Sequence, residues 1–77
     1  MMRCDEWLSS PSKTEEGNSW ILGYWTATNE PHLKFVGRQL GPDGIIKQVK
    51  KECAPQPRMP LLAVAASLYR KAEKVGQ

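Results

Sequence analysis

Cysteine and histidine are the residue types that most often act as nucleophile, base or zinc ligand, and this 77-residue chain has three of them: Cys4, His32 and Cys53. A histidine acts as a general base when a nucleophile lies within hydrogen-bond reach, and a cysteine acts as a nucleophile when a base activates it. His32 is the only histidine, and it stands in the turn-like sequence EPHL with no nucleophile beside it. We therefore predict that the chain is not an enzyme and has no catalytic residues.

Metal and cofactor motifs are also missing from the sequence. Structural zinc sites use closely spaced pairs of ligands, whereas the two cysteines and the histidine stand singly. The stretch GRQLGPDG has glycines but neither the GK[ST] ending nor the GxGxxG spacing of a phosphate-binding loop. Glu15 and Glu16 are adjacent in a polar stretch, which does not suit a paired acid and base. We expect no metal and no cofactor.

The cysteines and the first residues of the chain indicate in which cellular compartment the protein is expected. Small disulfide scaffolds normally carry more than one bridge, so two distant cysteines predict reduced thiols. The first ten residues, MMRCDEWLSS, lack the apolar core of a secretion signal, and the longest apolar run, residues 60–66, is too short to span a membrane. We expect a cytoplasmic protein with no membrane partner.

The strongest candidate for a binding surface is the stretch SWILGYWTA, residues 19–27, which holds three of the six aromatic residues. Its aromatic and β-branched content predicts a strand. Alternation would place Trp20 and Tyr24 on one face, and Ile21 and Trp25 on the other. Both faces are apolar, and little of the chain remains to cover the second one. Which face is buried stays open, but one aromatic pair is expected to lie at the surface.

Basic residues are expected beside this surface. Residues 33–39, LKFVGRQ, predict the return strand of a hairpin, with Lys34 and Arg38 on the same face. Charge is also unevenly distributed, because residues 1–33 carry two basic and five acidic side chains, and residues 34–77 carry nine and three. The predicted partner-binding residues are Trp20, Tyr24, Trp25, Lys34 and Arg38.

The elements around this hairpin predict a small α+β fold over residues 1–77, as a single domain. Residues 9–19 are polar and predict a flexible arm or loop. The hairpin, or a three-stranded antiparallel sheet, comprises about residues 19–27 and 33–39, packed against one or two C-terminal helices at about 43–53 and 59–75. Residues 45–53 leave helix and strand open, although apolar side chains spaced by three and four favour helix.

These observations predict a non-enzymatic protein-binding module, an adaptor or inhibitor that uses the aromatic strand and its basic flank. Small proteins of phages and mobile elements often act in this way, and residues 57–73, PRMPLLAVAASLYRKAE, resemble the C-terminal helix of small phage-encoded proteins. The alternative is a single-stranded nucleic-acid-binding protein that stacks bases on the same aromatics. A homodimer that pairs the aromatic faces is a further alternative.

Overall fold

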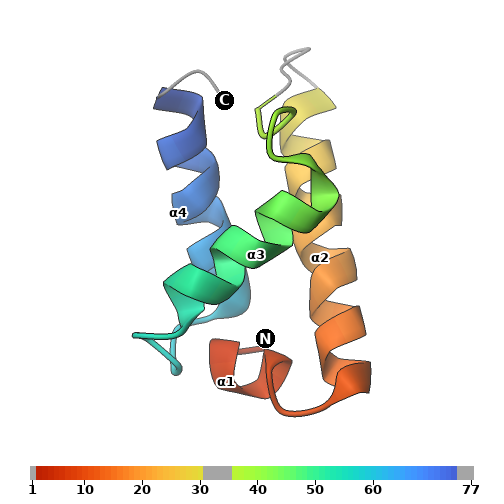
Figure 1. Ribbon diagram of the computed structural model, residues 1–77, viewed down its shortest axis with the longest axis vertical. Helices are drawn as coiled ribbons and strands as arrows, with labels where there is room; N and C mark the ends of the chain where they lie inside the picture. Colours follow the sequence, from red (N-terminus) through yellow and green to blue (C-terminus); the bar gives the residue numbers. More distant parts are fainter. Residues whose placement is uncertain (1, 31–35, 75–77) are drawn as a thin grey trace.

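The computed structural model describes residues 2–30 and 36–74 and is helical (Figure 1). Four helices occur within these residues: α1 (Cys4–Trp7), α2 (Pro11–Asn29), α3 (Gly41–Cys53) and α4 (Leu61–Lys74). The described residues form no strand, and their β-type pairing is limited to one isolated bridge between Arg3 and Pro60. The prediction of an α+β fold with a hairpin or three-stranded sheet is therefore wrong.

Helix α2 replaces both the predicted arm at residues 9–19 and the predicted strand at residues 19–27. It begins with a side-chain cap, because the Ser10 hydroxyl accepts a hydrogen bond of 3.2 Å from the backbone N–H of Lys13. Pro11 occupies the first turn, where its missing N–H costs nothing. The helix then continues through the aromatic residues because burial at every fourth position rewards a helical period.

The predicted return strand at residues 33–39 is not formed where the structure describes it. Residues 36–40 form turns, and the remainder of that segment, including Lys34, lies outside the described residues. The turn packs over α2, since the indole Nε1 of Trp25 donates a hydrogen bond of 2.6 Å to the carbonyl of Val36. Gly37 has a φ of 85°, and a Cβ there would lie 2.5 Å from the same indole nitrogen. This close approach requires glycine.

The two C-terminal helices are confirmed. Helix α3 settles the open choice at residues 45–53 in favour of a helix, and it begins at Gly41, two residues before the expected start. Helix α4 begins directly after Pro60 and has Lys71 and Lys74 in its last turn, where positive charge interacts favourably with the helix dipole. Both helices bury one stripe of apolar side chains, which is why their periodicity was readable in the sequence.

Helices α2 and α4 lie side by side and run in the same direction, and α3 crosses over them (Figure 1). Near the start of both helices, Gly17 of α2 is close to Leu61 of α4. Nearer their ends, the rings of Trp25 and Tyr69 meet edge to face, with centroids 5.1 Å apart. The short helix α1 contacts α2 and α3 at the other end of the core.

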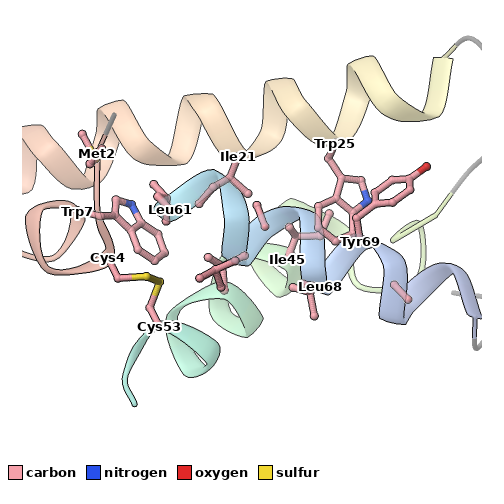
Figure 2. Close-up of a cluster of buried hydrophobic side chains, with 14 residues drawn as sticks. Met2, Cys4, Trp7, Ile21, Trp25, Ile45, Cys53, Leu61, Leu68 and Tyr69 are labelled. Carbon is pink, nitrogen blue, oxygen red and sulfur yellow. A yellow bond between two sulfur atoms is a disulfide. The ribbon is translucent and has the colours of Figure 1, made fainter. Parts of the chain in front are cut away.

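A disulfide joins Cys4 of α1 to Cys53 at the end of α3, so the prediction of reduced thiols is wrong (Figure 2). The two cysteines meet because the N-terminal segment pairs with residues 57–61. The backbone N–H of Cys4 donates to the carbonyl of Met59 at 2.9 Å, and the N–H of Leu61 donates to the carbonyl of Met2 at 2.8 Å. No local sequence pattern predicts this pairing of distant segments.

Trp7 is fully buried beside the disulfide and fixes α1 against α2 (Figure 2). Its indole Nε1 donates to the carbonyl of Thr14 and to Oδ1 of Asn18, each at 3.1 Å. The ring lies so close to Gly17 that a Cβ there would overlap it, and that Cβ would also lie 2.8 Å from Leu61. Gly17 therefore allows α1, α2 and α4 to approach one another.

Candidate functional site

An open apolar hollow lies between α2 and α4, and we call it the α2–α4 groove. Its volume is about 610 Å³. Helix α2 supplies most of the lining, and α4 supplies one side chain: the lining residues are Ser19, Trp20, Gly23, Tyr24, Ala27 and Leu62. The small side chains of α2 leave the hollow open, and the aromatic side chains form its wall.

The helical period explains why these residues share one side of α2. Trp20 and Tyr24 are four positions apart, which places them on one face of a helix, as alternation would in a strand. Ile21 and Trp25 have the same spacing and are buried, with exposed fractions of 0% and 3%. Trp20 is 40% exposed. The aromatic segment is thus two-sided, with Ile21 and Trp25 in the core, Trp20 exposed and Tyr24 half-buried.

Tyr24 is half-buried and held in place, whereas Trp20 extends from the surface. The Tyr24 ring packs edge to face against Tyr69 of α4, with centroids 6.2 Å apart and an interplanar angle of 85°. Leu62 follows Leu61, which is fully buried. The groove wall is therefore fixed to the core, so a ligand would meet a largely preformed surface.

The structure separates the five residues predicted to bind a partner. Trp20 and Tyr24 line the α2–α4 groove. Trp25 is buried, and with Arg38 it lines a second hollow of about 350 Å³ between α2, the 36–40 turn and the start of α3. Arg38 is exposed. Lys34 lies outside the described residues. Arg38 therefore lies on another surface than Trp20 and Tyr24.

Asn29 lines the second hollow, and no sequence motif marks its role there. Its Oδ1 accepts hydrogen bonds from the hydroxyl of Tyr69 at 2.6 Å and from the backbone N–H of Val36 at 3.2 Å. Its Nδ2 donates to the carbonyl of Val36 at 3.1 Å. Asn29 therefore joins the end of α2 to the following turn and to α4, and its polar atoms are occupied by the protein itself.

The exposed lysines of α3 form a third surface. Lys47, Lys50 and Lys51 are exposed, and α3 buries Ile45 and Val49 on its other side. Spacings of three and four positions place the lysines close together on one face of the helix. No residue of α3 lines the α2–α4 groove. The lysines and the exposed aromatics thus occur on different elements.

Side chains that could hold a metal do not gather within residues 2–30 and 36–74. These residues contain no cluster of three or more histidine, cysteine, aspartate or glutamate side chains able to hold a metal. Cys4 and Cys53 are joined to each other, and His32 lies outside the described residues. None of the described helices combines the length and the apolar character needed to cross a membrane.

Comparison with known proteins adds no relative. No family model matches the chain, and neither the curated proteins nor the solved structures contain a match.

Proposed function

We propose that this chain is a non-enzymatic protein-binding module, an adaptor or inhibitor, that binds its partner through the α2–α4 groove. The observation that carries the proposal is Trp20, a large aromatic side chain that is 40% exposed beside an apolar hollow. Tryptophan and tyrosine are the residues most enriched among those that dominate binding energy at protein interfaces. Trp20, Tyr24 and Leu62 are the proposed anchors.

The shape of the groove indicates what kind of group it receives. Gly23 and Ala27 leave space next to the Trp20 indole, and nothing lies within 4 Å of the position that a Cβ on Gly23 would occupy. An apolar side chain of the partner would fill this space and be enclosed by the aromatic rings. Such a buried anchor with a polar rim is the usual anatomy of a protein interface.

Single-stranded nucleic acid is the alternative ligand of the same aromatics. That mode needs stacked bases and a line of lysines or arginines that follows the phosphates. Among the described residues, no lysine or arginine lines the α2–α4 groove, and the exposed lysines of α3 are on another element. This separation favours a protein partner over a nucleic acid.

The cytoplasmic location remains a prediction, and so does an origin in a phage or mobile element. The buried Cys4–Cys53 disulfide argues for an oxidising compartment, because disulfides are rare in reduced cytosol. Alkylation of thiols in intact cells, followed by mass measurement, would report the state of the pair. Full labelling of both cysteines would support the cytoplasm, and no labelling would support an oxidising compartment.

A photo-reactive amino acid at position 20 tests the proposal. We expect benzoylphenylalanine at this position to cross-link to a distinct polypeptide in an extract of the native cell, and the same group at exposed Lys47 to give no such adduct. Gly23→Gln is the matched blocking variant, because it fills the hollow from a position with open space around it. Loss of the adduct in this variant is expected, with the helical content unchanged.

Two results would overturn the proposal. One is equal cross-linking from positions 20 and 47. The other is saturable quenching of tryptophan fluorescence by a single-stranded oligonucleotide that weakens steeply as salt rises, because release of counterions from phosphates gives that dependence. In the second case the groove would be a platform for bases.

A further inference from the structure

We propose that this chain forms a homodimer in which the α2–α4 groove of one copy packs against the same groove of the other. The two α2 helices then run antiparallel about a two-fold axis. This inference rests on the proposed function, since it takes the groove to be an interaction surface. It adds the identity of one partner and the register of the contact. A two-fold interface requires that one surface carry both members of every complementary pair.

The first complementary pair is one of shape. Trp20 extends from α2, and Gly23, three positions later on the same groove, leaves open space. The two positions are separated by about 4.5 Å along the helix axis. If the two-fold axis passes between Ile21 and Leu22, Trp20 of each copy lies opposite Gly23 of the other. Each indole then enters the hollow of the opposite chain.

The second complementary pair is one of charge, and it has the same midpoint. Lys13 precedes Trp20 by seven positions, and Glu30 follows Gly23 by seven. Seven positions are about two helical turns, so Lys13 lies nearly in line with Trp20 along α2, and Glu30 nearly in line with Gly23. The axis that sets Trp20 opposite Gly23 therefore also sets Lys13 opposite Glu30 of the second copy. Opposite charges would meet at both ends of the apolar contact.

Both charges are available for such a contact. Lys13 has a half-exposed side chain, and its distance of 4.0 Å to Glu16 within the chain is at the limit of an ion pair. Glu30 is exposed at the end of α2, and none of the ion pairs among the described residues involves it. A parallel arrangement of the two α2 helices would instead set Lys13 beside Lys13 and Glu30 beside Glu30. Charge thus selects the antiparallel register.

Charge reversal tests this register. In Lys13→Glu, glutamate would face glutamate at both ends of the contact, and in Glu30→Lys, lysine would face lysine. We expect each variant alone to raise the dissociation constant of the dimer, measured by sedimentation equilibrium, by about tenfold or more. An equimolar mixture of the two variants should associate as tightly as the unmodified chain, within about threefold, because every contact again pairs opposite charges. Both positions are at the surface, so circular dichroism should show unchanged helical content.

Three results would overturn the inference. The unmodified chain could sediment as a monomer up to high micromolar concentration, the single variants could dimerise as well as the unmodified chain, or the mixture could fail to recover association. The proposed function fails separately: cross-linking from position 20 to a polypeptide of another mass, lost in Gly23→Gln and absent from position 47, would uphold it even if the chain is a monomer. Absence of every adduct, including one of twice the chain mass, would overturn both.

Discussion

Reduction of the Cys4–Cys53 disulfide is expected to remove a large part of the stability of this fold. The two cysteines are separated by 49 positions, and closing a loop of this length lowers the entropy of the unfolded chain by an amount worth roughly 4 kcal/mol at 25 °C. A chain of 77 residues is expected to have a free energy of unfolding of roughly 4–12 kcal/mol. The reduced protein should therefore be marginally stable.

Urea unfolding followed by tryptophan fluorescence measures this effect. The oxidised protein and the protein in excess reductant should differ by about 3–4 kcal/mol in free energy of unfolding, as a shift of the midpoint to lower urea. Cys4→Ala/Cys53→Ala is the control, because reductant should not move its midpoint. The local effect should be largest at α1, a single turn whose attachment depends on the disulfide, on Trp7 and on backbone pairing with residues 57–61.

One result would refute this reasoning. If a thiol assay shows that both cysteines are free in reductant while the unfolding midpoint stays unchanged, the disulfide does not restrict the unfolded chain as argued. Faster hydrogen exchange confined to residues 4–8, without any change in the midpoint, would mean that α1 alone depends on the bond.

Substitutions at five positions of α2 test the packing and the groove by urea unfolding. Gly17→Ala should lower the free energy of unfolding by about 1–3 kcal/mol, because the added Cβ overlaps a buried indole. Gly23→Ala should raise it by about 0.5–1 kcal/mol, because open space surrounds that position and alanine favours a helix. Equal effects of the two substitutions would contradict the described packing. Trp25→Ala should lower the free energy of unfolding by about 3–5 kcal/mol and Trp20→Ala by under about 1 kcal/mol, with the second variant losing dimeric species; the reverse order would exchange their buried and exposed roles. Asn29→Ala should lower the free energy of unfolding by about 1–3 kcal/mol, because it removes the hydrogen bonds that Asn29 Oδ1 accepts from the Tyr69 hydroxyl and the Val36 N–H; an unchanged midpoint would show that water replaces the amide.

The sequence predicted α3 and α4 because each helix has one buried stripe and one polar face. It failed for α2, where apolar side chains occur on more than one side and obscure the helical period. The spacing of four between Trp20 and Tyr24, and between Ile21 and Trp25, fits both periods, since four positions are two repeats of a strand and about one turn of a helix. The sorting of residues into two faces therefore did not depend on the choice of element.

The start of α2 carries a helix signal in the sequence. Ser10 followed by Pro11 is a typical helix beginning, and the stripe of Gly17, Ile21 and Trp25 at intervals of four continues from it. The polar composition of residues 9–19 predicts an arm and the aromatic content of residues 19–27 predicts a strand, and both patterns hide this helix start. The β-propensity of a short segment depends strongly on its packing surroundings, and here burial against α4 decides.

Other features required the three-dimensional structure. The disulfide depends on the N-terminal segment pairing with residues 57–61, and the role of Gly17 depends on an indole that arrives from α1. The separation of Arg38 from Trp20 follows from the rotation of a helix, which places Leu22 and Thr26 on the flank toward α3 and Trp20 on the flank toward α4. A predicted strand could not have given that separation.

The most direct test of the proposed interaction surface is the comparison of photo-cross-linking from position 20 and from position 47. The account predicts a discrete polypeptide adduct from position 20, absent from position 47, and lost when Gly23→Gln fills the α2–α4 groove. An adduct that persists in the filled groove, or that forms equally from α3, would contradict the assignment of this groove as the site where the protein binds its partner.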